Sequence, residues 1–135
     1  MNEFSWQVSY NVNVEPMDRQ HQKIFDYMAT VHGALANKAE YNDTKEMLDK
    51  LNIYCKMHFY EEERLMEEMN YPSTLGHKRQ HDRFVLDLDS FRFRFSDLQR
   101  HTQKASDDFV MIKDWFINHI LSEDMRYSEF YINKH

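Results

Sequence analysis

Residues 47–69 have the sequence MLDKLNIYCKMHFYEEERLMEEM. Apolar side chains recur in it at steps of three and four residues, which is the period of one face of an α-helix. His58 and Glu62 occupy two positions of that face, one helical turn apart. The pattern predicts a long amphipathic helix that turns a histidine and a carboxylate toward the core. The predicted inward positions are Met47, Leu48, Leu51, Cys55, His58, Glu62, Leu65 and Met69.

The same periodicity occurs in three further stretches, residues 17–35, 77–95 and 109–120. Four amphipathic helices with short connections predict an all-α fold, an antiparallel up-down-up-down four-helix bundle. We expect a single domain over residues 1–135, with an extended N-terminal arm and a short C-terminal helical tail. Asp18 is the expected N-cap of the first helix and Asp43 that of the second. The polar residues 99–106 are expected to link the last two helices.

Composition excludes several classes of protein. The chain has 135 residues with only two glycines and two prolines, which argues against an all-β fold with many tight turns. Its net charge of −6 disfavours nonspecific nucleic-acid binding. No run is long and apolar enough for a membrane span or a signal peptide. A single cysteine, Cys55, cannot form an internal disulfide, and we expect a soluble cytoplasmic protein.

Metal-binding side chains recur at positions that should face the core. Each predicted helix carries at least one of them: His21; His58 and Glu62; His77 and His81; His119, followed by Glu123 and Asp124. Any one of these histidines can be an ordinary hydrogen-bonded core residue. A buried polar group without a partner costs about 1–3 kcal/mol, so the whole set would destabilise a small core. Metal ligation would satisfy all of them together, and the set therefore predicts a metal site.

The composition of the ligand set narrows the choice of metal. It contains five imidazoles and two carboxylates but no thiolate, so zinc fingers and iron–sulfur clusters fit poorly. Seven ligands are too many for one ion and suit a binuclear site of ions such as iron, although manganese or zinc could also occupy it. No glutamate has a histidine three residues later, which disfavours the glutamate-rich di-iron bundles.

The motifs that carry these residues resemble those of bacterial hemerythrins. They are DRQH at 18–21, HFYEE at 58–62, the histidine pair at 77 and 81, and NHILSED at 118–124, with Trp6 on the arm. The resemblance covers essentially the whole chain. It implies two iron ions joined by an oxo or hydroxo bridge, held as in that family. By resemblance, His21 and His58 ligate one iron, His77, His81 and His119 ligate the other, and Glu62 and Asp124 bridge both.

Helical spacing and the resemblance disagree about one carboxylate. Spacing favours Glu123, four residues after His119, whereas the family pattern places the bridge at Asp124. In a regular helix a residue five positions on lies about 140° around the axis. Choosing Asp124 therefore predicts a distorted backbone near residues 121–123, such as a π-bulge. Asn13 also departs from the family, which often has glycine there, but asparagine tolerates a left-handed backbone.

Ligand counting indicates what such a site could do. Two octahedral ions offer about twelve positions, and the implied ligands with one bridging oxygen leave a single vacancy, on the iron held by His21 and His58. The resemblance implies that O₂ binds there reversibly. The expected pocket around O₂ is apolar and is formed by Ile24, Phe25, Phe59, Ile117 and Leu121.

The leading hypothesis is a non-enzymatic protein that binds O₂ for storage or for delivery to an oxygen-consuming enzyme. A sensor module read by a redox partner is the first alternative, which the short chain without an expected output domain disfavours. Detoxification of peroxide, nitric oxide or iron is the second alternative. A metal-free bundle for protein contacts is a third, and the inward histidines make it the weakest.

Overall fold

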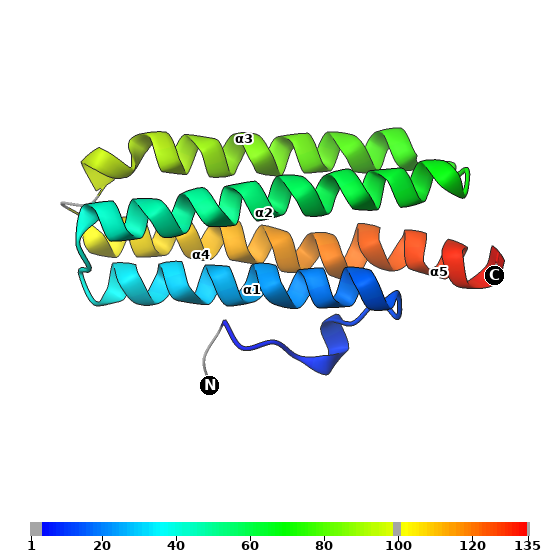
Figure 1. Ribbon diagram of the computed structural model, residues 1–135, viewed down its shortest axis with the longest axis horizontal. Helices are drawn as coiled ribbons and strands as arrows, with labels where there is room; N and C mark the ends of the chain where they lie inside the picture. The colour runs from blue at the N-terminus through cyan, green and yellow to red at the C-terminus, as the bar shows by residue number, and fades with distance from the viewer. Residues whose placement is uncertain (1–3, 99–100, 135) are drawn as a thin grey trace.

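A computed structural model describes residues 4–98 and 101–134 of the chain. Four long helices lie side by side with alternating direction (Figure 1), and each contacts its two neighbours in the order α1–α2–α3–α4–α1. The structure is therefore the predicted antiparallel four-helix bundle. Its elements are η1 (Val8–Tyr10), α1 (Glu15–Ala36), α2 (Tyr41–Glu68), α3 (Thr74–Leu98), α4 (Thr102–His119), the π-helix η2 (Ile120–Asp124) and α5 (Met125–Lys134).

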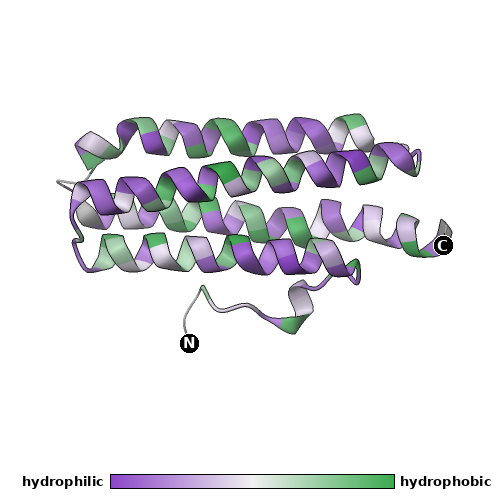
Figure 2. Cartoon of the chain, in the orientation of Figure 1, coloured by the Kyte–Doolittle hydropathy of each residue, from purple (hydrophilic) through white to green (hydrophobic). Residues whose placement is uncertain are grey.

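The core lies along the bundle axis, where the predicted apolar faces meet. Hydrophobic and hydrophilic residues alternate along each helix (Figure 2), as the three-and-four spacing requires. On α1, the apolar side chains at this spacing are buried: Met17, Ile24, Phe25, Met28, Val31 and Leu35. On α2 to α4 most are buried, while a few at the edges of the faces are half-buried: Met47, Leu65, Val85 and Trp115.

The predicted helix starts were wrong at three places. Helix α1 begins at Glu15, before Asp18, because Pro16 fits the first turn of a helix and needs no amide partner there. Helix α2 begins at Tyr41, two residues before Asp43, and the ring of Tyr41 stacks on Phe95 with centroids 5.3 Å apart. That tertiary contact extends the helix beyond the capping residue that local rules favour. Helix α4 begins at Thr102, inside the polar stretch expected to be a link.

The N-terminal arm is hydrogen-bonded to two helices, α1 and α5. The carboxylate of Asp18 accepts hydrogen bonds from the amides of Val12 (2.7 Å) and Asn13 (3.0 Å), so it ties the arm to α1 instead of capping the helix. Asn13 has φ of 65°, the left-handed conformation expected for it. The hydroxyl of Ser128 on α5 donates to the carbonyl of Val12. The arm is therefore held by α1 and α5 together.

The π-helix lies where the sequence predicted a distortion. Residues 120–124 follow α4 without a break and lead into α5, so α4, η2 and α5 form one continuous rod (Figure 1). A π turn adds one residue to the helical repeat and rotates the residues that follow it. This segment therefore changes which side chains the end of η2 and α5 present to the core.

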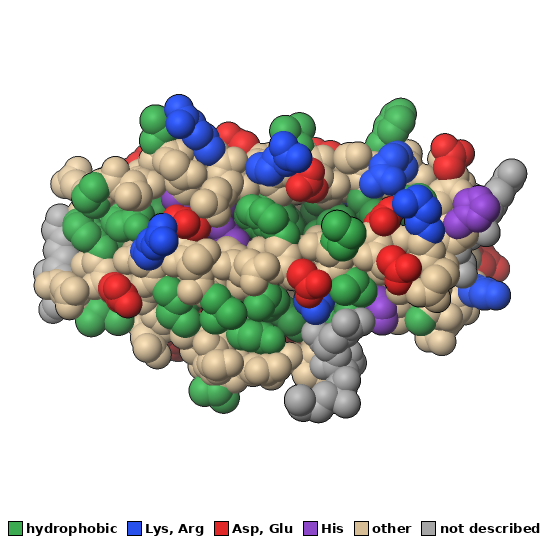
Figure 3. All heavy atoms as spheres, turned by 180° about the vertical axis from the view of Figure 1, so that it is seen from behind, with side chains coloured by type: hydrophobic (Ala, Val, Ile, Leu, Met, Phe, Trp, Pro, Cys, Tyr) green, Lys and Arg blue, Asp and Glu red, His purple; other side chains and the backbone are tan. Residues whose placement is uncertain are grey.

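The outer surface carries charges of both signs. On the face seen in Figure 3, basic and acidic side chains are interspersed with apolar ones. None of the helices within residues 4–98 and 101–134 combines the length and the apolar character that crossing a membrane requires.

Candidate metal centre

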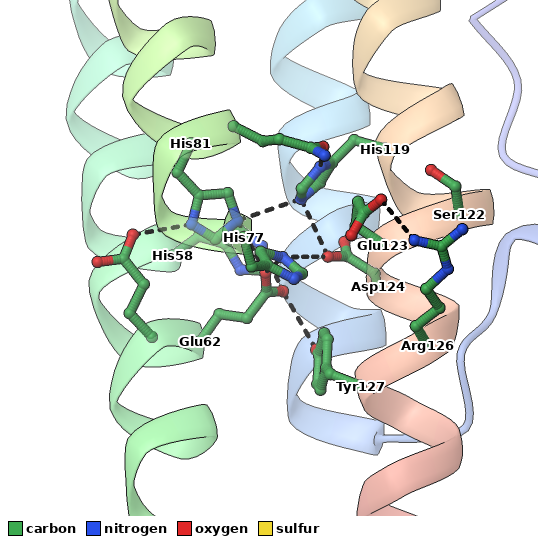
Figure 4. A network of polar contacts seen from close by, with 12 residues as sticks. His58, Glu62, His77, His81, His119, Ser122, Glu123, Asp124, Arg126 and Tyr127 are labelled. Carbon is green, nitrogen blue, oxygen red and sulfur yellow. Dashed lines mark hydrogen bonds and ion pairs between the residues drawn. The ribbon is translucent and has the colours of Figure 1, made fainter. Parts of the chain in front are cut away.

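The seven predicted ligands meet at one place in the core. All four helices of the bundle contribute, and the π-helix contributes one more side chain. Figure 4 shows the contributions of α2, α3, α4 and the π-helix. Each of the seven is at most 2% exposed. Their ligand atoms form two groups in which all atoms lie within 4.8 Å of one another. The larger group is Glu62, His77, His81, His119 and Asp124, and the smaller is His21, His58 and Glu62.

The two carboxylates lie between the two histidine groups. Glu62 directs Oε2 toward His58, 3.3 Å from its Nε2, and Oε1 toward His77 and His81, each 2.9 Å away. Asp124 does the same: Oδ2 lies 3.2 Å from Nε2 of His21, and Oδ1 lies 2.9 Å from Nε2 of His77. One oxygen of each carboxylate therefore faces each side of the site.

Several ligand atoms lack a hydrogen bond although they are buried. Within the described chain, neither oxygen of Asp124 has a hydrogen-bond partner, nor does Nε2 of His21 or of His58. The Nε2 atoms of His81 and His119 lie 3.1 Å apart, facing one another. Orphaned buried polar atoms are costly in a protein core. Cations bound between these atoms would satisfy them, so the residues present fit a metal centre.

The charges of the site are strongly coupled. Burial alone would raise the pKa of Glu62, but the surrounding histidines outweigh burial and hold the pKa well below its ordinary value. Burial and the charge of Glu62 would also raise the pKa of Asp124, yet His119 and His21 lower it. Both carboxylates are therefore ionised, as metal ligation would require.

The histidines respond differently to this environment. Burial lowers the pKa of His21 and His77, but the carboxylates of Asp124 and Glu62 outweigh burial and raise each pKa to about 9. The pKa of His81 is also raised, by Glu62 and Glu63 against burial. For His58 burial dominates and the pKa falls. Cation binding must displace protons from such a site, which is the usual linkage for histidine ligands.

Four further side chains contact the candidate ligands and were missed from the sequence. The amide oxygen of Gln20 accepts from Nδ1 of His58 (2.7 Å), and that of Gln80 accepts from Nδ1 of His119 (2.9 Å). Glu63 accepts from Nδ1 of His81 (2.8 Å). The hydroxyl of Tyr127 donates to Oε2 of Glu62 at 3.1 Å.

These partners fix the tautomer of three histidines. An amide or carboxylate oxygen can only accept, so the proton of the neutral imidazole lies on Nδ1 in His58, His81 and His119. Nε2 then keeps a lone pair directed into the site, as metal ligation requires. The signal for these partners lies in the fold and not in the local sequence, because each one comes from a different helix than its histidine.

The π-helix brings Asp124, and not Glu123, to the site. Asp124 is fully buried among the histidines, whereas Glu123 pairs with Arg126 at 3.1 Å (Figure 4). The extra residue in the π turn accounts for this choice, since regular helical geometry would have turned Glu123 inward.

The residues expected around O₂ occupy different places. Ile24, Phe25 and Phe59 are buried, and the ring of Phe59 stacks on His81 with centroids 4.0 Å apart. Phe25 packs against the aromatic side chains of the arm, 5.7 Å from Trp6. Of the two remaining residues expected in the pocket, Ile117 is half-buried and Leu121 is 45% exposed.

Leu121 is therefore not positioned to close a buried pocket. The π turn that carries Asp124 inward leaves Leu121 at the surface. Phe116, which was not predicted for the pocket, packs its ring edge on His21 with centroids 5.8 Å apart and is completely buried. Its place on the inward face of α4 was the available signal.

His32, His101 and Cys55 are not among the residues whose ligand atoms cluster. His32 stacks on Phe4 of the arm, with centroids 4.5 Å apart. His101 and Tyr60 are exposed. Cys55 is buried, and burial raises the pKa of its thiol. His135 lies outside the described residues.

Comparison with known proteins agrees with this geometry. The family described as the hemerythrin HHE cation binding domain matches residues 12–131. The chain belongs to the hemerythrin family. It is 31% identical over 125 residues to a bacteriohemerythrin of Stenotrophomonas maltophilia, covering 92% of this chain and 78% of the relative. A hemerythrin-like protein of Naegleria gruberi is also 31% identical, over 92% of this chain and 90% of its own length.

Solved structures show the same hemerythrin fold. A crystal structure of a hemerythrin mutant superposes with a TM-score of 0.76 at 29% identity, covering 96% of this chain and 97% of the other. Family membership and the cluster of histidines and carboxylates together identify the chain as a hemerythrin-type cation-binding domain.

Proposed function

We propose that this hemerythrin-family chain holds two iron ions and binds O₂ reversibly, without catalysing a reaction. The proposed ligands are His21, His58, Glu62, His77, His81, His119 and Asp124. The observation that carries the proposal is the placement of Glu62 and Asp124, each with one oxygen toward either group of histidines. Carboxylates in that arrangement suit two bridged cations better than one.

The number of histidines on each side supports an open position. One side has three imidazoles, and the other has only His21 and His58. When bound, the pair of iron ions would supply a vacant coordination position and the electrons that reversible O₂ binding needs. An oxo or hydroxo bridge between the ions belongs to the same proposal.

The residues of the chain would keep the open side dry. Ile24 is buried one turn after His21, Phe59 lies 5.4 Å from His58 between ring centroids, and Phe116 packs edge-on against His21. Apolar walls would exclude water from the open side and so limit proton transfer there. We propose these three residues, with Phe25 behind them, as the pocket; Ile117 is a weaker member.

The test is iron content and a visible spectrum, recorded anaerobically after reduction and again after air is admitted. We expect two irons per chain and a colour change that reverses when oxygen is removed. His77→Ala should fall well below two irons, whereas His101→Ala, at an exposed histidine, should keep both.

The other outcomes favour other functions. Two irons that oxidise in air without a reversible oxygenated state would refute the carrier and favour a sensor or the detoxification of peroxide or nitric oxide. Fewer than two irons in the unmodified protein would refute the di-iron centre itself. We further propose a cytoplasmic location, which the single buried thiol supports, and storage of O₂ or its delivery to an oxygen-consuming enzyme.

A further inference from the structure

The outer partners of the histidines differ in charge. His58 and His119 donate from Nδ1 to neutral amides, those of Gln20 and Gln80. His81 donates instead to a carboxylate, Oε2 of Glu63, at 2.8 Å. This difference is unexplained by packing, because glutamine and glutamate have nearly the same shape.

The charge of Glu63 acts on His81 with reduced screening by solvent. Its side chain is only 24% exposed, while the imidazole of His81 is 1% exposed. Partial burial reduces the screening of a charge by solvent and salt. The ring of Phe59 stacks on His81 at an interplanar angle of 16°, so the imidazole is held from its face and from Nδ1 together.

His58 also has a carboxylate nearby, but the two interact only through an intervening residue. The amide nitrogen of Gln20 donates to Glu61, so Gln20 links His58 and Glu61 in a chain of two hydrogen bonds. Glu61 is exposed, and a neutral amide separates it from the imidazole. The electrostatic effect of Glu61 on His58 is therefore weaker than the effect of Glu63 on His81.

The chemical effect of such a partner is known in general terms. A carboxylate that accepts from Nδ1 forms a charge-assisted hydrogen bond and raises the basicity of Nε2. A more basic imidazole donates more electron density to its cation and favours the higher charge state of that cation. His81 belongs to the group with three histidines, so the effect is stronger on that side.

We propose that Glu63 is a positioning residue that makes the three-histidine position the tighter of the two, and the one that better stabilises the higher charge state of its ion. The inference rests on the proposed two-cation centre. It makes the two positions unequal through a residue that touches neither cation.

The test compares Glu63→Gln with the unmodified protein, because glutamine keeps the hydrogen-bond acceptor and removes the charge. Glu67→Gln is the matched control: Glu67 is one turn further along α2, carries the same charge and contacts Lys78 instead of a ligand. Gln80→Glu is the converse variant, since it adds a carboxylate behind His119 on the same side of the site. Circular dichroism of each metal-free protein checks that it folds.

The first measurement is titration with Co²⁺, which does not depend on oxygen chemistry. Mutation of an outer partner typically lowers metal affinity by about 10–100-fold. We expect Glu63→Gln to weaken one of the two sites by that factor, Gln80→Glu to tighten one, and Glu67→Gln to leave both unchanged. A merely structural role of Glu63 would weaken both sites or neither.

The second measurement is the reduction potential of the iron-loaded protein. We expect Glu63→Gln to raise it, by about 59 mV for each tenfold change in the ratio of affinities for the two oxidation states. If the unmodified protein binds two Co²⁺ and Glu63→Gln matches Glu67→Gln in affinity and potential, this inference is wrong and the proposed centre stands. If the unmodified protein does not bind two cations, both fall together.

Discussion

The buried hydroxyl of Tyr127 offers a sharp test of how the ligands are held. Tyr127 is completely buried on α5, and its hydroxyl donates to Oε2 of Glu62 at 3.1 Å. Its ring lies edge-on to His77, with centroids 5.6 Å apart. Tyr127→Phe removes the hydroxyl and leaves the ring contact, so the change isolates one hydrogen bond to a buried carboxylate.

The expected loss follows from the charge of the acceptor. A hydrogen bond to a charged group contributes about 1.5–3 kcal/mol. The histidines around Glu62 also contact its oxygens, so we expect the lower end, about 1.5 kcal/mol in the metal-free protein. With an unfolding entropy of roughly 2.1 cal mol⁻¹ K⁻¹ for each of the 135 residues, this loss lowers Tm by about 5 °C.

The assay is urea unfolding and thermal melting of the metal-free protein, followed by circular dichroism. Tyr60→Phe is the control, because Tyr60 is 62% exposed and the change should stay within about 0.5 kcal/mol. If Tyr127→Phe is as stable as Tyr60→Phe, the hydroxyl does not stabilise the buried carboxylate and the argument from burial is refuted.

Three other predictions concern single positions. Asp124→Ala should reduce bound iron to well below two per chain, whereas Glu123→Ala should keep two; metal analysis decides, and the reverse result would mean that Glu123 is the bridge. Burial raises the pKa of the Cys55 thiol, so little reactive thiolate forms at pH 8, and a thiol reagent should label Cys55 slowly until denaturant is added; fast labelling of the folded protein would contradict this. Asn13 has φ of 65°, so Asn13→Ala should lower the free energy of unfolding by about 1 kcal/mol and Asn13→Gly should not; equal effects in urea titrations would exclude backbone strain as the cause.

The sequence by itself was sufficient to predict the bundle. Apolar positions repeat at three and four residues, and this local period directly encodes which face of each helix is buried. The π-helix was also predictable, but only because the resemblance selected Asp124, five residues after His119, and so required a distorted turn. The start of α2 was not, since the Tyr41–Phe95 contact joins residues far apart in the chain.

The identity of the candidate ligands was likewise contained in the sequence. Histidines and carboxylates on an apolar face are costly unless something binds them, and this cost is visible without coordinates. Their partners were decided by tertiary structure alone. Gln20 and His58 are 38 residues apart, and Tyr127 and Glu62 are 65 apart. Such pairs depend on how the helices are rotated and aligned against one another, which no local period encodes. The same packing exposed Leu121 and brought Phe116 to His21.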